Sequence, residues 1–172
     1  MFFVDFSVLK EIFKTGHFVA HNAIFEIQFL THQGFPGMNI GCSMLLSQLL
    51  DAAKRSPFDP DEEEDDEDKT GLSLYKRTGH SLDAVVQRLL GMKVAKTEQI
   101  SDWGKRELTS SQINYAGLDA LLTYKVATIM AKELAEMKMV KAYKLLKDMQ
   151  HVVAHMQLEG LPVDWEYHTP LS

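Results

Sequence analysis

Three side chains in this sequence have the chemistry and spacing to bind a metal ion and position a water molecule. Tyr115 and Asp119 are four residues apart in a predicted helix, so both side chains project from the same face, one turn apart. Glu26 lies on another predicted helix, directly after an apolar strand, where open α/β folds place their ligands. We therefore take Glu26, Tyr115 and Asp119 as candidate catalytic residues, with the two carboxylates as candidate metal ligands.

The helix that carries Tyr115 and Asp119 has clear start signals. Thr109 and Gln112 form a capping-box pattern, which predicts a helix from this point to about Leu134. A second helix is predicted from roughly 140 to 159, because Gly160 follows its last apolar residue. The C-terminal half is therefore expected to be rich in helix.

The N-terminal half predicts alternating strands and helices, which indicates an α/β fold. Asn22 is expected to cap the helix that holds Glu26, and Ser81 to cap a helix that ends at Gly91. The predicted elements are a strand at Phe2 to Val4, a helix from Ser7 to Gly16, a strand at Phe18 to Ala20, and helices over Ala23 to Leu30, Met44 to Leu50 and Leu82 to Leu90.

Length and composition are those of an ordinary globular protein. The 172 residues are 45% hydrophobic and 24% charged, which is enough for one core of normal size, and Trp103 is expected to anchor it. Cys42 is the single cysteine, so we expect a buried thiol and no internal disulfide. The start of the chain has neither a basic leader nor an unbroken apolar run, so we expect a cytoplasmic protein with no membrane partner.

The negative charge is concentrated in one segment. The net charge is −6, yet Asp59 and the run from Asp61 to Asp68 hold nine of the 24 acidic residues. Without them, 18 basic residues face 15 acidic ones, a net of +3, which is compatible with binding nucleic acid. Residues 54–71 also contain prolines, so we expect this stretch to be a disordered acidic insertion.

Several stretches resemble, in order, the motifs of the DnaQ-like 3′-to-5′ exonucleases. His21 to Leu30 resembles the second motif, N-x-x-x-[DE], and Tyr115 to Ala120 the third, Y-x-x-x-D, of the tyrosine branch. Lys96 to Trp103 and Leu108 to Gln112 resemble the K-x-x-Q-x-S-D-W and L-x-x-x-Q stretches before the third motif. Met156 to Asp164 resembles the exit of such domains into a family-A DNA polymerase, which favours that group over RNase D.

The resemblance implies a ribonuclease H-like fold that hydrolyses 3′-terminal phosphodiesters of single-stranded DNA with two metal ions, Mg²⁺ or Mn²⁺. Glu26 and Asp119 would bind metal, and Tyr115 would orient the attacking water. The nucleic-acid-binding residues implied by the motifs are His21, Asn22, Phe25 and Gln112. Residues 1–136 would form the exonuclease domain, and 137–172 a helix and the start of the connection to a polymerase domain.

The sequence departs from the family at its beginning. The family carries two more metal ligands in a D-x-E motif on its first strand, whereas Phe2 to Val4 matches the third strand. We therefore expect an N-terminally truncated fold with an exposed edge strand. The partner expected to bind this chain is a polymerase domain, a chain that supplies the missing strands, or a second copy of the chain. Two readings remain: an exonuclease completed from elsewhere, or an inactive module that binds nucleic acid or protein. The sequence leaves DNA and RNA substrates undistinguished.

Overall fold

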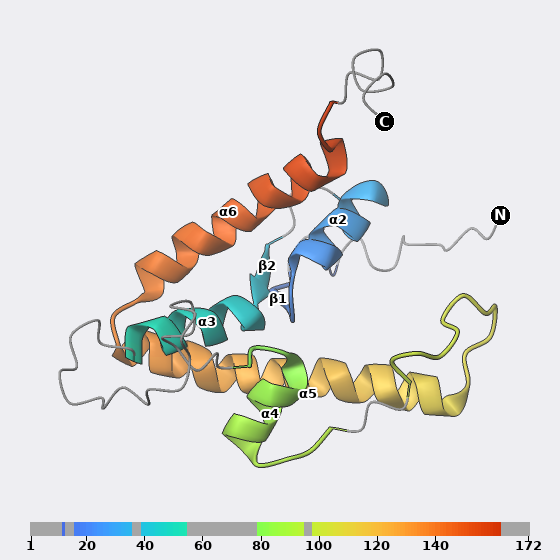
Figure 1. The fold of residues 1–172 in the computed structure, drawn as a ribbon, viewed down its shortest axis with the longest axis horizontal. Coiled ribbons are helices and arrows are strands. Elements are labelled where there is room, and N and C mark those ends of the chain that lie inside the picture. The colour runs from blue at the N-terminus through green and yellow to red at the C-terminus, as the bar shows by residue number, and fades with distance from the viewer. Residues whose placement is uncertain (1–11, 13–15, 36–38, 55–78, 95–97, 163–172) are drawn as a thin grey trace, which may run out of the picture.

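The computed structural model describes residue 12 and residues 16–35, 39–54, 79–94 and 98–162. A small parallel sheet lies between two groups of helices (Figure 1). On one side are α2 (Ile24–His32) and α6 (Val140–Glu159), which pack against each other. On the other side, α5 (Ser110–Glu136) packs against α3 (Ser43–Lys54) and α4 (Leu82–Leu90). The described part of the chain is thus helix-rich α/β, as the sequence predicts.

The sheet consists, in the described residues, of two short strands. β1 (Phe18–Ala20) pairs in parallel with β2 (Ile40–Cys42), with Phe18 opposite Ile40 and Ala20 opposite Cys42. The strands are joined through α2, the helical crossover that parallel neighbours require. β1 agrees with the prediction. β2 was not predicted, because its three residues form a strand through pairing with β1 and not through a local signal. The strand predicted at Phe2 to Val4 lies outside the described residues.

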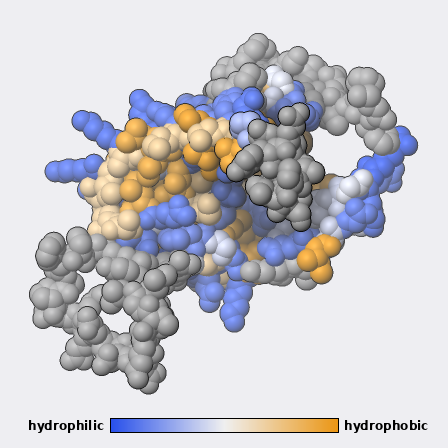
Figure 2. All heavy atoms as spheres, turned by 45° about the horizontal axis from the view of Figure 1, so that its top comes forward, coloured by the Kyte–Doolittle hydropathy of each residue, from blue (hydrophilic) through white to orange (hydrophobic). Residues whose placement is uncertain are grey.

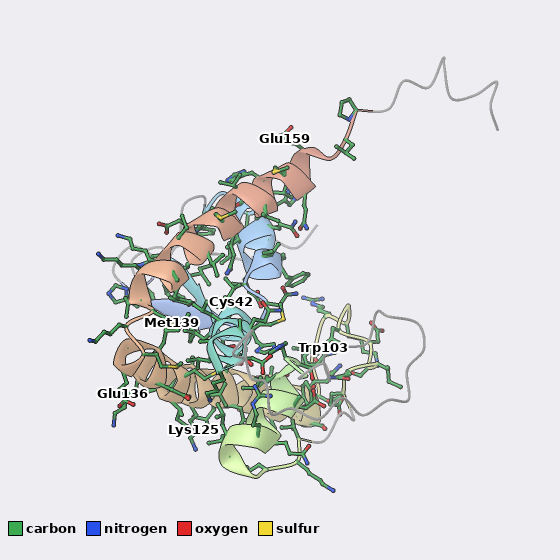
Figure 3. The ribbon with its side chains drawn as sticks, turned by 60° about the vertical axis from the view of Figure 1, so that its left-hand side comes forward. Cys42, Trp103, Lys125, Glu136, Met139 and Glu159 are labelled. Carbon is green, nitrogen blue, oxygen red and sulfur yellow. The ribbon has the colours of Figure 1, made fainter. Side chains whose placement is uncertain are left out.

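A tyrosine from α6 fixes the position of β2. The Tyr143 hydroxyl accepts a hydrogen bond from the backbone N–H of Cys42, at 2.8 Å. A Cβ added to Gly41 would lie 3.1 Å from the same hydroxyl oxygen, so glycine allows this close approach. Cys42 is a buried free thiol, as predicted, and Figure 3 shows it between α6 and α5. The contact ties the sheet to the C-terminal helix.

The helices of the C-terminal half match their predicted bounds closely. Thr109 caps α5 through the predicted capping box, and α6 runs over the predicted residues. Gly91 ends α4 in the left-handed conformation, with φ of 67°. Ser81 occupies the N-cap of α4 but makes no side-chain capping bond. Local start and stop signals therefore define these helices well.

The start of α2 differs from the prediction. The N-cap position belongs to Ala23, and no side chain caps this helix. Asn22 instead adopts a left-handed conformation, with φ of 66°, and its carbonyl accepts a hydrogen bond from the N–H of Phe25 at 3.2 Å. Asparagine tolerates this conformation better than other non-glycine residues do. The expected role of Asn22 as a cap is therefore wrong, and the residue forms the tight turn between β1 and α2.

Two clusters of buried apolar side chains hold the helices to the sheet. The first lies between α3, α4 and α5, and the second between the strands, α2 and α6. The buried members of the first are Leu46, Leu50, Val85, Val86, Leu122, Val126, Ala127, Met130 and Leu134, and those of the second are Ala23, Ile27, Ile40, Cys42 and Ala154. Each described helix therefore contributes buried apolar side chains to one of the two clusters.

The outer face of α6 carries a row of apolar side chains. Leu145, Met149, Val152 and Met156 follow one another at spacings of four, three and four residues, and each is more than half exposed. Figure 2, in which the top of Figure 1 comes forward, shows apolar surface gathered where α6 lies. The described part of the chain leaves this row uncovered.

The remaining predictions on the N-terminal half lie beyond the description. α3 ends at Lys54, and the acidic insertion that follows falls outside the described residues, as does all of the helix predicted from Ser7 except residue 12 and Gly16. Among the described helices, none is long and apolar enough to cross a membrane.

Candidate active site

Asp119 and Tyr115 form a pair on α5, as their spacing predicts. The carboxyl group of Asp119 is partly buried, and it accepts a hydrogen bond from the Tyr115 hydroxyl. Burial raises the pKa of Asp119, while the Tyr115 hydroxyl and the nearby His21 ring act in the opposite direction. The phenol therefore stabilises the charged form of the carboxylate that a metal ion would need.

Trp103 packs against the Tyr115 ring. The two ring centroids are 6.3 Å apart, with the ring planes at 53°, a tilted arrangement that is favourable for aromatic pairs. The indole Nε1 donates a hydrogen bond to the carbonyl of Glu98 at 2.9 Å, which fixes the indole in place. Trp103 is 40% exposed, so it is not the core anchor that the sequence suggested. It borders the candidate site and restricts the orientation of Tyr115.

Gln112 holds the segment that carries Trp103 against the start of α5. Its side-chain amide donates to the Ser101 hydroxyl at 3.1 Å and to the Asp102 carbonyl at 3.0 Å. Its side-chain oxygen accepts from the N–H of Thr109 at 2.9 Å. Gln112 is only 2% exposed. The predicted role of Gln112 in binding nucleic acid does not fit this geometry, because its polar atoms are used inside the chain.

Glu26 lies on the first turns of α2, and it is half-buried. Its Oε2 atom is buried and has no hydrogen-bond partner in the described structure. Burial raises the pKa of this carboxyl group, and a hydrogen bond from its own backbone lowers it in part. Asn22 and Phe25, the neighbouring candidates for binding a nucleotide, are both exposed. A buried carboxylate oxygen without a partner is costly unless a ligand or a proton satisfies it.

His21 connects the end of β1 to α3 and lies near Asp119. Its Nδ1 is 2.9 Å from the hydroxyl of Ser43, which itself donates to the carbonyl of Ala20 at 3.2 Å. Since the hydroxyl has one proton, Nδ1 is the donor to Ser43, and neutral His21 carries its proton there. Nε2 is buried and has no hydrogen-bond partner in the described structure. Burial lowers the pKa of His21, while the backbone of His80 and the charges of Asp83 and Asp119 oppose this effect.

A second group of polar side chains lies beside His21 and was not predicted from the sequence. The Ser47 hydroxyl lies 2.9 Å from Nδ1 of His80 and accepts a hydrogen bond from Arg88 at 2.7 Å. Asp51 lies 3.8 Å from the other ring nitrogen of His80. Serines one turn apart, at 43 and 47, with leucines on both sides of Ser47, are the signal that could have indicated buried polar contacts on α3. The group joins α3 to the start of α4.

The two predicted metal ligands come from different helices. Glu26 lies on α2 and Asp119 on α5. Within the described ranges, no group of three or more His, Cys, Asp or Glu side chains is placed to hold a metal ion. Their oxygen donors suit a hard divalent cation, but these two residues are short of a full ligand set.

Comparison with known proteins gives consistent results. Residues 3–135 match the DNA_pol_A_exo1 family, described as 3′-5′ exonuclease. DNA polymerase I of Aquifex aeolicus (strain VF5) is 27% identical over 181 aligned residues, which cover 94% of this chain and 27% of the polymerase. The chain therefore spans about a quarter of the length of this relative.

Solved nuclease structures share the fold. The Brucella melitensis nuclease NrnC has a TM-score of 0.64 at 19% identity, covering 92% of this chain and 65% of NrnC. A structure described as the apo form of the nuclease has a TM-score of 0.62 at 19% identity, covering 87% of this chain and 60% of the other. Together with the match over residues 3–135, these findings show that the chain belongs to the 3′-5′ exonuclease domain family of the family-A DNA polymerases.

Proposed function

We propose that this chain is the main part of a 3′-to-5′ exonuclease that hydrolyses the terminal phosphodiester of a single-stranded DNA 3′ end. The observation that carries the proposal is the hydrogen-bonded pair of Tyr115 and Asp119 within a sequence that matches the exonuclease family over residues 3–135. Structures of NrnC with bound Mg²⁺ and bound to pGG are consistent with a metal-dependent nuclease that takes short nucleic acids.

The roles of the residues follow from their contacts. Tyr115, held by Trp103 on one side and hydrogen-bonded to Asp119 on the other, would orient the attacking water. Asn22 and Phe25, both exposed on the side of α2 next to Glu26, would contact the terminal nucleotide, with the phenyl ring stacking on its base. His21 would support Asp119 from the interior, since its ring is half-buried and anchored to Ser43.

Glu26 and Asp119 would bind Mg²⁺ or Mn²⁺. The unpartnered Oε2 of Glu26 and the ionised form of Asp119 offer the oxygen ligands that these ions prefer. A bound divalent ion would stabilise the charge that develops on the scissile phosphate. Because the described residues lack a third ligand, further acidic side chains from outside them would complete the site.

A release assay tests this proposal. We expect the purified chain, with Mg²⁺ or Mn²⁺, to release the labelled terminal nucleotide from 3′-labelled single-stranded DNA, and Asp119→Asn to lower the rate by about 100-fold or more. Asp148→Asn, which changes an exposed carboxylate on α6, is the matched control and should retain the full rate. Equal rates for wild type and Asp119→Asn would contradict the proposal, as would no release by either. Binding of DNA without release would support a non-catalytic module.

The partners that we propose attach at two surfaces. No other strand pairs with the outer edge of β1 in the described part of the structure, so a strand from a second copy or from another chain could extend the sheet there. The apolar row on α6 would face a polymerase domain, as suggested by a relative nearly four times as long as the matched region. We propose a cytoplasmic location, which is compatible with both a strand-pairing partner chain and a polymerase domain.

A further inference from the structure

Two phenylalanines on α2 are held out of the core. Phe25 is 67% exposed and Phe29 is 52% exposed. By contrast, Phe18 and Phe35 pack against the cluster between the sheet, α2 and α6. Exposed aromatic side chains of this size commonly mark a place where something binds.

The two rings lie on one face of the helix. Residues four apart on an α-helix are neighbours, and a rise of about 1.5 Å per residue places their Cα atoms about 6 Å apart along the axis. Ile27, two residues from each of them, points to the opposite side and is 3% exposed. The face of α2 that carries Phe25 and Phe29 is therefore turned away from the core along its whole length.

This face is continuous with the candidate active site. Asn22 lies in the turn that precedes α2 and is exposed, and Glu26 follows Phe25 in the helix. The row Asn22, Phe25, Phe29 thus starts at the residues that would bind the terminal nucleotide and continues along the helix to Phe29. A polymer whose end is held at Asn22 and Glu26 would pass over Phe29 next.

We propose that Phe29 is a second base-stacking platform, so that the terminal base of a 3′ end stacks on Phe25 and the penultimate base on Phe29. The inference rests on the proposed function and adds the number of nucleotides that the site takes. Stacking on phenyl rings accepts every base, because each base has an aromatic face. The two-ring platform predicts recognition of two nucleotides without sequence preference.

The spacing of the rings selects single strands over duplexes. Successive bases of one strand of a DNA duplex lie about 3.4 Å apart along the axis. Rings separated by about 6 Å along α2 can each receive a base only when the two bases have separated from each other. An unpaired, extended 3′ end can meet this requirement, and a base-paired end cannot.

A nucleic acid fits this surface better than a protein partner does. Stable protein interfaces bury more than about 1,000 Å² in total, which two phenyl rings on one helix do not provide. The polar residues at one end of the row, Asn22 and Glu26, are also those expected for a nucleotide and its metal ion rather than for an apolar protein surface.

Equilibrium binding to single-stranded DNA, with Ca²⁺ present to hold the ends without rapid cleavage, tests the proposal. We expect Phe29→Ala to weaken the binding of dinucleotides and longer strands by about 5- to 150-fold, and to leave the binding of a mononucleotide unchanged. Phe29→Trp should restore binding, because indole also stacks. Leu145→Ala, which removes a comparably exposed side chain from α6, should bind every strand like the wild type.

A fluorescent base locates each stacking position. With 2-aminopurine as the penultimate base, binding should quench its fluorescence in the wild type, and Phe29→Ala should remove the quenching. With the probe at the terminal base, Phe25→Ala should remove the quenching and Phe29→Ala should not. Equal weakening of mononucleotides and longer strands by Phe29→Ala, or no weakening of either, would overturn the platform.

The binding assay also separates this inference from the proposed function. Wild-type protein that binds strands in this length-dependent way but releases no nucleotide would support the platform and contradict the exonuclease activity. Wild-type protein that cleaves strands, with Phe29→Ala binding them equally well, would support the activity and contradict the platform. Absence of binding by wild type would contradict both.

Discussion

The two sides of the candidate site differ in how completely their polar atoms are satisfied. On the α5 side, Gln112 is buried and uses its amide in three hydrogen bonds, which hold Thr109, Ser101 and Asp102 together. On the α2 side, Oε2 of Glu26 is buried and has no hydrogen-bond partner in the described structure. Within the described residues, the side-chain polar atoms of Gln112 are all hydrogen-bonded, whereas the α2 side keeps one unsatisfied carboxylate oxygen.

The difference indicates which side is scaffold and which side receives a ligand. Buried polar atoms without partners are rare in folded proteins, and they concentrate where water, an ion or a substrate binds. A fully bonded network instead fixes geometry. The α5 side therefore positions Tyr115 and Asp119 before a ligand binds. The α2 side is the part that a bound ligand would stabilise most. The three predictions that follow perturb one side or the other.

The largest effect is expected at Gln112. Gln112→Ala removes three hydrogen bonds and leaves the N–H of Thr109 and the carbonyl of Asp102 without this partner. We expect a loss of about 2 to 4 kcal/mol in the free energy of unfolding, measured by urea denaturation. Gln87→Ala, at an exposed position of α4, should change it by less than about 0.5 kcal/mol. Equal effects of the two changes would show that the α5 side is not a fixed scaffold.

A smaller effect on the same side is expected at Thr109. Its hydroxyl accepts from the N–H of Gln112 at 3.2 Å, whereas Ser81, at the N-cap of α4, makes no side-chain capping bond. Thr109→Ala should therefore cost about 1 kcal/mol in the free energy of unfolding, and Thr109→Ser should recover most of it. Ser81→Ala should cost clearly less than Thr109→Ala. The reverse order would contradict the assigned capping roles.

The elements of the α5 side could be predicted because their signals are local. The capping box at Thr109 and Gln112 and the stop at Gly91 each depend on residues within one or two turns. β2 could not be predicted in the same way. Its three residues become a strand through pairing with β1, 22 residues earlier in the chain, and through the Tyr143 hydroxyl from α6. Such contacts depend on the tertiary fold.

The roles of two site residues could not be predicted from the sequence either. Asparagine is favoured both as a helix cap and in a left-handed turn, so the sequence around Asn22 could not distinguish the two. Gln112 stands at a motif position, and its partners Ser101 and Asp102 come from a preceding loop whose path the sequence does not reveal. The pair of Tyr115 and Asp119 was predicted because both lie on one helix.

The smallest effect is expected at Glu26, and it depends on pH. Because burial raises the pKa of Glu26, the folded chain keeps this proton to higher pH than the unfolded chain does. The stability contributed by the neutral form is full below the unfolded pKa and is lost as pH rises through the folded pKa. Glu26→Gln should therefore raise the melting temperature slightly at neutral pH, and leave it unchanged in mild acid.

Addition of Mg²⁺ sharpens this last prediction, because an ion bound to the carboxylate removes the cost of its buried charge. Wild type should then regain the stability that Glu26→Gln gains, so the difference in melting temperature at neutral pH should shrink with Mg²⁺ and return with a chelator. Gln28→Glu, which places a carboxylate two residues away on the same helix, should show no such response to Mg²⁺. A Mg²⁺-independent difference between wild type and Glu26→Gln would mean that the unsatisfied oxygen of the α2 side is not a metal ligand.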